Sequence, residues 1–278
     1  MLDVMARISL IVAFILFGFV TGPSQAGEKV ETLPTRAGVT VKAIVNMDAG
    51  PRAPIVILLA GGDGTLSLDS WSGKGSPSGN FLVRSRGLFA ANGLNLVVPD
   101  APSDLVGPYS GSLKGSRISI GYAEDMRALI NSMRARGITG TAFLVGTSRG
   151  TIGAAGAAAR LPATVLGGIV LTASVTVTSK NGTGHNIFNA DLEAIKIPVL
   201  FAHHREDACY VTPDTDIPRV ARALKNAPSI KQLYYKDGGP FTGRDCGSSA
   251  AHGFVGIEPK VVTDIADWIK KVAAGKTP

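Results

Sequence analysis

The sequence has little of several features that mark particular protein classes. Only two of its 278 residues are cysteine, so it is not a small domain held together by several disulfides. Aromatic residues make up 6% and charged residues 18% of the chain. Its 34 glycines and 16 prolines follow no fixed period, which argues against collagen and coiled coils. With 45% hydrophobic residues, the chain can bury a sizeable core.

Runs of one charge are also missing, although the net charge is +7. Lysine and arginine are dispersed as singles and doublets such as Lys270-Lys271, with no basic tract and no interleaved aromatic residues. This pattern does not predict binding to nucleic acid. We interpret the charge as a source of solubility, with affinity for anionic surfaces or substrates.

The longest hydrophobic run is near the N-terminus and is short. Residues 8–20 (ISLIVAFILFGFV) follow Arg7 and precede the small-residue sequence Ser24-Gln25-Ala26, as in a secretory signal peptide. The run falls short of the roughly 20 residues that span a bilayer. We therefore expect cleavage after Ala26, export to the periplasm or the medium, and no stable membrane insertion after processing. Because Asp3 offsets the charge of Arg7, an uncleaved anchor is the alternative.

We find no internal repeat and no linker, so residues 1–26 form the expected signal peptide and residues 27–278 one domain. Short apolar, β-branched runs alternate with longer amphipathic ones, which predicts parallel strands linked by helices. The expected strands are 39–46, 54–60, 94–99, 141–146, 165–173, 197–203 and 230–235. The expected helices are 80–92, 120–136, 149–160, 215–226 and 258–273. Several strands are apolar on both faces, so the predicted fold is a three-layer α/β sandwich.

The residues Gly146-Thr147-Ser148-Arg149-Gly150 match the G-x-S-x-G pattern of a nucleophile elbow. In such a turn a strand passes sharply into a helix and exposes the serine hydroxyl. With 34 glycines the bare pattern is weak, but here an apolar strand precedes it and a small-residue helix follows. We therefore predict Ser148 as a nucleophile; a tight glycine turn without chemistry is the alternative.

A serine hydroxyl needs a base to remove its proton, and four histidines are candidates. His185 lies in an irregular segment, whereas His203 and His204 end a strand, where at least one is expected to pack locally. His252 lies in the loop between the last expected strand and the last expected helix. Because such a loop can fold back over the edge of the sheet, we predict His252 as the base and keep His204 as the alternative.

The base in turn needs a carboxylate, placed between serine and histidine in chain order. Asp207 lies just past an expected strand and is our prediction. Its neighbour Glu206 is the alternative, although successive side chains of an extended segment point in opposite directions. The same histidines and carboxylates could suggest a metal, but no C-x-x-C or H-x-x-x-H spacing supports zinc, so we expect no metal.

Two backbone N–H groups are expected to stabilise the oxyanion of the reaction. One is that of Arg149, directly after the serine. The other belongs to the glycine loop that follows an early strand, where Gly62 is the first choice and Asp63 the second. The loop lacks the lysine of a P-loop and does not match G-x-G-x-x-G, so we expect no nucleotide or other cofactor.

Together, Gly61-Gly62, the 146–150 turn, Asp207 and His252 resemble the α/β-hydrolase superfamily over essentially the whole mature chain. The resemblance implies a mostly parallel sheet of eight strands and a Ser-His-Asp triad that acts on esters, thioesters, lactones or amides. Compact members without a cap, such as dienelactone-hydrolase-like and carboxylesterase-like proteins, are the most similar. Ala60 stands where a histidine often precedes the oxyanion glycines, which leaves the second donor open.

The expected function is that of an exported serine esterase acting on a small ester-type substrate. The alternatives are a small serine peptidase or amidase, and a binding or scaffold protein that keeps the fold without the reaction. Arg84, Arg86 and Arg149 are weak candidates for binding a substrate carboxylate. Their alternative role is structural, through pairing with Asp100 or Asp104.

The two cysteines, Cys209 and Cys246, are expected to form a disulfide in an oxidising compartment. Since Cys209 follows Asp207 closely and Cys246 precedes His252, this bond would tie the loop of the acid to the loop of the base. Two separately buried thiols are the alternative.

Overall fold

The computed structural model describes residues 27–73, 75–76, 78–105, 113, 115–179 and 184–276. Eight strands form one sheet in the order β1-β2-β4-β3-β5-β6-β7-β8. Their bounds are β1 Lys29–Arg36, β2 Val39–Asn46, β3 Ile55–Leu59, β4 Asn95–Pro102, β5 Ala142–Thr147, β6 Gly168–Thr172, β7 Val199–His204 and β8 Ile230–Tyr235. Strands β3 to β8 pair in parallel, whereas β1 and β2 are antiparallel. The predicted three-layer α/β fold with a mostly parallel sheet of eight strands is confirmed.

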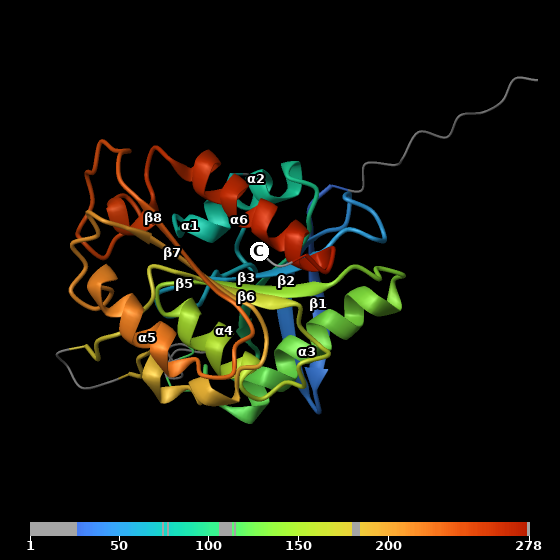
Figure 1. Ribbon diagram of the computed structural model, residues 1–278. Coiled ribbons are helices and arrows are strands. Elements are labelled where there is room, and N and C mark those ends of the chain that lie inside the picture. The colour runs from blue at the N-terminus through green and yellow to red at the C-terminus, as the bar shows by residue number, and fades with distance from the viewer. Residues whose placement is uncertain are drawn as a thin grey trace, which may run out of the picture.

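Helices cover both faces of the sheet (Figure 1). One face carries α1 (Phe81–Arg84), α2 (Arg86–Ala91) and α6 (Glu258–Ala273). The other carries α3 (Ile120–Ala135), α4 (Gly150–Ala158) and α5 (Ile217–Ala223). In the described connections lie four short 3₁₀ helices, namely η1 Ile187–Asn189, η2 Leu192–Ala194, η3 Asp214–Asp216 and η4 Ala251–Gly253.

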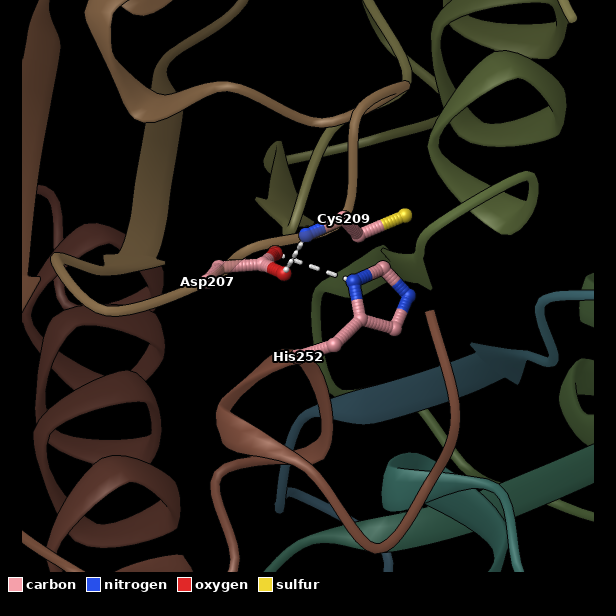
Figure 2. A group of neighbouring side chains, drawn as sticks. All are labelled: Asp207, Cys209 and His252. Atoms are coloured by element: carbon pink, nitrogen blue, oxygen red, sulfur yellow. Dashed lines mark hydrogen bonds and ion pairs between the residues drawn. The ribbon is translucent and has the colours of Figure 1, made fainter. Parts of the chain in front are cut away.

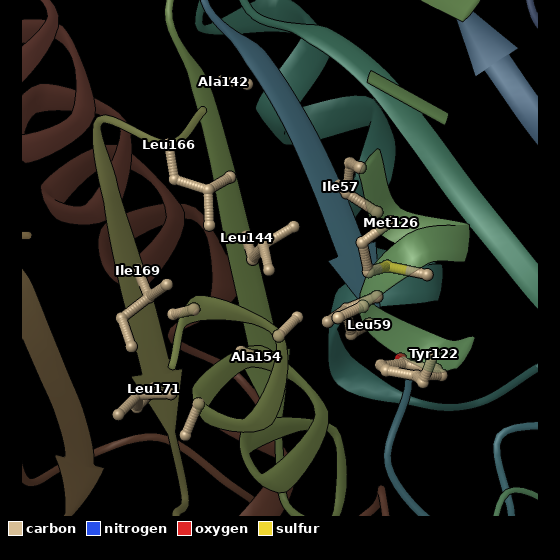
Figure 3. Close-up of a cluster of buried hydrophobic side chains, with 14 of the residues drawn as sticks. Ile57, Leu59, Tyr122, Met126, Ala142, Leu144, Ala154, Leu166, Ile169 and Leu171 are labelled. Atoms are coloured by element: carbon tan, nitrogen blue, oxygen red, sulfur yellow. The ribbon is translucent and has the colours of Figure 1, made fainter. Parts of the chain in front are cut away.

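The central strand β5 shows why its sequence lacks polar positions. Leu144 packs on the face covered by α3 and α4 (Figure 3), while Phe143 and Val145 pack on the opposite face. Every residue of β5 is buried. The partner helix α4 is built of glycine, alanine and other small residues, so it can lie close to the sheet. Strand β5 and helix α4 therefore form a rigid base for the turn between them.

Two elements differ from the sequence-based expectation. The helix expected over 80–92 is two helices that meet at Ser85, whose φ of −91° and ψ of 4° interrupt the first of them. Strand β1 was not expected because its sequence, KVETLPTR, is polar and contains Pro34. It is an antiparallel edge strand on which only Leu33 is fully buried, so it carries almost no hydrophobic signal.

The expected signal peptide, residues 1–26, lies outside the described residues. Among the residues that the structure does describe, no helix has the length and apolar character needed to cross a membrane. The described part of residues 174–190, which link β6 toward β7, contains the short helix η1.

Candidate active site

Ser148 stands in the turn between β5 and α4 with a φ of 51°, a left-handed conformation that is rare for residues other than glycine. Its N–H donates to the carbonyl of Thr172 at 2.9 Å. A Cβ on Gly146 would lie 2.4 Å from the carbonyl oxygen of Gly150, and one on Gly150 would lie 2.1 Å from that of Leu59. Because backbone occupies both spaces, the turn requires its glycines and holds Ser148 in a strained, partly exposed position.

Asp207 follows β7, and His252 lies in η4 between β8 and α6. His252 Nδ1 is hydrogen-bonded to Asp207 Oδ2 at 2.9 Å (Figure 2). This contact leaves Nε2, on the far side of the ring, for a partner other than the carboxylate. The two side chains are 7% and 1% exposed, so water competes little for the bond. The arrangement is that of a histidine base oriented by a carboxylate.

Two further contacts hold the carboxylate of Asp207. Its Oδ1 accepts the backbone N–H of Cys209 at 3.0 Å, and its Oδ2 accepts the hydroxyl of Thr212 at 2.9 Å. The Thr212 hydroxyl is also 3.3 Å from His252 Nδ1. Sequence reasoning missed Thr212, because a threonine five residues after an acid carries no recognisable signal. Glu206, the alternative acid, is exposed and has only its N–H near a histidine, His204.

Ser148 and the acid–base pair lie at the same edge of the sheet. The N–H of Ser148 donates to Thr172 and that of Ala173 donates to Ala202, so the carboxyl ends of β5, β6 and β7 are consecutive there. No hydrogen bond joins Ser148 to His252, both of which the structure describes. Hydrogen bonds between a nucleophile and its base often tighten only when substrate binds.

The other three histidines have different partners. His203 is fully buried and its Nε2 accepts the N–H of Ser174 at 3.1 Å. Burial lowers the pKa of His203 to about 4. His204 Nε2 donates to the carbonyl of Asp237 at 2.7 Å. His185 lies apart from both and lines a small pocket beside the turn. Of the four histidines, all described, only His252 is paired with a carboxylate.

The expected oxyanion donors lie around Ser148. Gly62 has a φ of +60°, and a Cβ on its neighbour Gly61 would lie 2.9 Å from the Cβ of Ser148, so the glycine loop abuts the serine. Within the described residues, the N–H groups of Gly62 and Arg149 donate to no protein acceptor. The side chain of Asp63 turns back to accept the N–H of Thr65 at 3.1 Å.

Two of the three arginines considered for substrate binding, Arg84 and Arg86, are occupied by the protein itself. Arg84 pairs with Glu258 at 2.9 Å and also donates to the carbonyls of Gly79 and Gly253. Arg86 pairs with Glu28 at 2.9 Å and stacks over Trp71. These contacts correct the prediction that Arg84 and Arg86 bind a substrate carboxylate, because their guanidinium groups already have carboxylate partners.

The carboxylates expected to pair with these arginines have other roles. Asp100 accepts the backbone N–H groups of Leu66 and Leu68 and so shapes the segment after the glycine loop. Asp104 pairs with Arg36 at 3.0 Å. The structural role was therefore predicted with the wrong partners, because the pairing depends on how distant segments of the chain pack.

Cys209 and Cys246 form a disulfide, as predicted, with a sulfur–sulfur distance of 2.04 Å. The bond joins the segment after Asp207 to the segment before His252. Asp207, Cys209 and His252 are also the one group of potential metal ligands found among the described residues, with ligand atoms within 4.8 Å of one another. Since the sulfur of Cys209 is bonded to Cys246, it is no thiolate ligand, and the group fits an acid–base pair better than a metal.

No protein-family model matches the chain, and no curated protein matches it. Solved structures do. An esterase from Pyrococcus furiosus aligns with a TM-score of 0.62 at 12% identity, over 89% of this chain and 91% of its own. An α/β-hydrolase enzyme from a Medee basin deep-sea metagenome aligns with a TM-score of 0.56 at 15% identity, over 89% and 99%. A lidless α/β serine hydrolase from Xanthomonas campestris aligns with a TM-score of 0.51 at 15% identity, over 91% and 98%.

Proposed function

Because this chain has the α/β-hydrolase fold, we propose that it is a serine hydrolase that cleaves a small ester-type bond, namely a carboxylic ester, thioester or lactone. The observation that carries the proposal is the 2.9 Å contact between His252 Nδ1 and Asp207 Oδ2, at the same sheet edge as the strained turn of Ser148. Solved esterases and serine hydrolases of the same fold support it.

In the proposed reaction, Ser148 Oγ attacks the carbonyl carbon of the ester while His252 Nε2 accepts the hydroxyl proton. Asp207 holds the N–H at Nδ1 and stabilises the imidazolium that forms. The carbonyl oxygen becomes an oxyanion, which the N–H groups of Arg149 and Gly62, or Asp63 in place of Gly62, stabilise. Collapse of this intermediate breaks the bond to the leaving oxygen, which takes the proton from His252 and departs as an alcohol.

The acyl group is then bonded to Ser148. A water molecule attacks the acyl carbon as His252 Nε2 takes its proton, and a second oxyanion forms in the same place. When it collapses, the bond to Ser148 breaks, the serine oxygen regains the proton from His252, and the carboxylic acid is released. The sum of the two halves is hydrolysis of one ester by one water, without a cofactor.

Export is part of the proposal. The N-terminal pattern of residues 1–26 and the disulfide between Cys209 and Cys246 both fit a protein that folds in an oxidising compartment. Expression in a bacterium with an intact secretion system tests this. The intact mass of the purified protein should be that of a chain whose first residue is Gly27. A full-length chain in the membrane fraction would show instead that the N-terminal segment is an anchor.

The test of the reaction is labelling with a fluorophosphonate probe, followed by mapping of the modified peptide. Ser148 should be labelled, and Ser148→Ala should lose both labelling and ester hydrolysis while its unfolding curve stays close to that of the wild type. Ser70→Ala, which changes an exposed loop serine, is the matched control. If Ser148→Ala keeps more than about a tenth of the wild-type rate, less than 1.4 kcal/mol in barrier, Ser148 is not the nucleophile.

A panel of substrates separates the competing functions. Turnover of esters but not of peptides or amides would exclude the peptidase alternative. A protein that neither reacts with the probe nor hydrolyses any member of the panel would be a binding or scaffold protein on this fold.

A further inference from the structure

A narrow pocket of about 20 Å³ lies beside the turn of Ser148. Gly62 and Arg149, the residues whose N–H groups we assign to the oxyanion, form part of its wall. Leu113, Gly115, Arg117, Ile152, Gly184 and His185 complete the wall. Two arginines and one histidine of this lining carry side-chain nitrogen donors, which are groups that bind anions.

Arg117 is the central feature of this pocket. Its side chain is 4% exposed, and its Nη2 donates to the carbonyl of Gly62 at 3.3 Å. Its Nη1 is buried and has no hydrogen-bond partner among the described residues. Burial lowers the pKa of Arg117; the nearby Tyr122 hydroxyl offsets part of this shift, and the charge of Arg149 adds to it. A buried guanidinium with an unused donor is costly for the protein unless something outside the fold completes it.

Neither Arg117 nor Arg149 forms a salt bridge within the described part of the chain. Six other arginines each pair with a carboxylate, namely Arg36, Arg84, Arg86, Arg136, Arg205 and Arg219. The internal segments outside the described residues contain no Asp or Glu that could act as a counter-ion. Asp63 is the acid that lies close enough to raise the pKa of Arg117, and it is exposed with its carboxylate engaged by Thr65.

His185 adds a second buried group without a hydrogen-bond partner. Its Nδ1 is buried without a hydrogen-bond partner among the described residues. A Cβ on the adjacent Gly184 would lie 3.9 Å from Nη2 of Arg149, which places the guanidinium of Arg149 against this segment. Buried polar groups are nearly always hydrogen-bonded, so two orphaned nitrogens on residues that line one small cavity indicate a ligand.

We propose that this pocket binds the carboxylate of the substrate, and that the enzyme prefers half-esters of short dicarboxylic acids. The inference rests on the proposed hydrolase function, since it names the substrate class of the same site. A carboxylate matches the planar fork of a guanidinium, to which it can bind through two parallel hydrogen bonds. The shared wall at Gly62 and Arg149 places the carboxylate a few bonds from the ester carbonyl.

The first experiment compares monoethyl succinate with ethyl 4-methylpentanoate, which replaces the carboxylate by an isopropyl group of similar shape. Ethanol release gives kcat/KM for each ester. The wild type should prefer the anionic ester by roughly 10- to 100-fold, the range of a hydrogen bond to a charged group. In Arg117→Gln, which keeps a donor for the carbonyl of Gly62, the ratio of the two kcat/KM values should fall by about tenfold or more. His185→Gln should lower the same ratio by less.

The control for net charge is Arg160→Gln, which removes an exposed guanidinium at the far end of α4 and should leave the ratio as it is in the wild type. If Arg117→Gln does not fold, Arg149→Gln takes its place, because that side chain is partly exposed and its backbone N–H is retained. A wild type that favours the neutral ester, or variants with the wild-type ratio, would overturn the proposal.

The second experiment does not depend on turnover. Titration calorimetry measures binding of monoethyl succinate to Ser148→Ala, with and without Arg149→Gln. We expect binding that weakens about tenfold or more when Arg149 is replaced, and no binding of ethyl 4-methylpentanoate at the same concentrations. Binding without any hydrolysis in the wild type would remove the proposed reaction and keep the pocket. Hydrolysis of neutral esters without anion binding would keep the proposed reaction and overturn the carboxylate pocket.

Discussion

The turn of residues 146–150 and the loop of residues 207–212 both follow parallel strands and end at the same edge of the sheet, but different forces shape them. In the turn, the backbone of Leu59 and Gly150 occupies the space that a side chain on Gly150 or Gly146 would need. Steric exclusion leaves Ser148 one conformation. In the loop, Asp207 is held by hydrogen bonds from Cys209 and Thr212 and by the disulfide to Cys246. The loop is therefore held by attractive contacts and a covalent bond.

The difference predicts different responses to change. A single added methyl group is enough to disrupt a sterically constrained turn, because a close-packed interior has no space for it. A set of hydrogen bonds fails in steps, since each bond can be altered alone. Substitutions in the loop of Asp207 should therefore be able to lower turnover without unfolding the protein. Substitutions of the glycines in the turn should affect turnover and stability together.

The largest expected effect is on the rate of Asp207→Asn. The amide keeps the size of the carboxylate and can still accept the N–H of Cys209, so the fold should persist. It cannot stabilise the imidazolium of His252 and favours the wrong tautomer, so kcat should fall by about 10⁴-fold. Steady-state kinetics and urea unfolding of the same preparation measure both quantities. A near-normal rate would transfer the role to another carboxylate, such as Glu206.

The turn should respond in the opposite way. Gly150→Ala places a Cβ 2.1 Å from the carbonyl oxygen of Leu59, so we expect the free energy of unfolding to fall by more than about 3 kcal/mol. Gly87→Ala is the matched control, because a Cβ there meets nothing within 4 Å in an exposed helical position. It should stabilise the protein by up to about 1 kcal/mol. If urea unfolding gave the same change in the free energy of unfolding for both variants, the steric explanation of the turn would be wrong.

Sequence reasoning was most successful for the turn, for a physical reason. The constraint at residues 146–150 is local, so the glycines, the apolar strand before them and the small-residue helix after them are all visible in consecutive residues. The strands 39–46 and 230–235 were placed at their observed ends for a similar reason, since their apolar content marks them. Strand β1 has no such content and was missed.

Features that arise from distant parts of the chain were the least predictable. Thr212 reaches Asp207 only because of the path of its loop, and Arg117 becomes buried only when its irregular segment packs against the glycine loop at Gly62. The partners of Arg84 and Arg86, Glu258 and Glu28, are 174 and 58 residues away in the chain. No short pattern encodes such pairs, because each depends on the finished fold.

The disulfide allows the covalent part of the loop to be tested alone. Cys209→Ser with Cys246→Ser should lower the free energy of unfolding by about 4 kcal/mol, on the entropic account of a loop closed over a separation of 37 residues. Turnover should also fall at temperatures where the variant is folded, because the loops of Asp207 and His252 are no longer joined. Kinetics below the melting temperature test this, and unchanged turnover would reduce the bond to a structural link.

The last effect that we predict is a pH dependence of stability that arises at His203, next to the loop of Asp207. His203 is fully buried beside this loop, and its Nε2 accepts the N–H of Ser174. Protonation of Nε2 would abolish that bond and place a charge in the interior, which is why burial lowers the pKa from 6.5 to about 4. The nearby Asp207 and Asp214 favour the charged form, but they offset the cost of burial only in part.

Because the folded pKa of His203 lies below the unfolded one, its contribution to stability is complete above pH 6.5 and is lost as the pH falls toward 4. The loss should reach about 3 kcal/mol at most. Urea unfolding at pH 7, 5.5 and 4.5 measures it against His203→Gln, whose amide oxygen can still accept from Ser174 but does not titrate. The wild type should lose more stability than this variant on acidification, whereas the difference between Gly150→Ala and the wild type should not depend on pH. Parallel curves for His203→Gln and the wild type would show that acid acts elsewhere, and a pH-dependent defect in Gly150→Ala would show that the two regions are coupled rather than independently held.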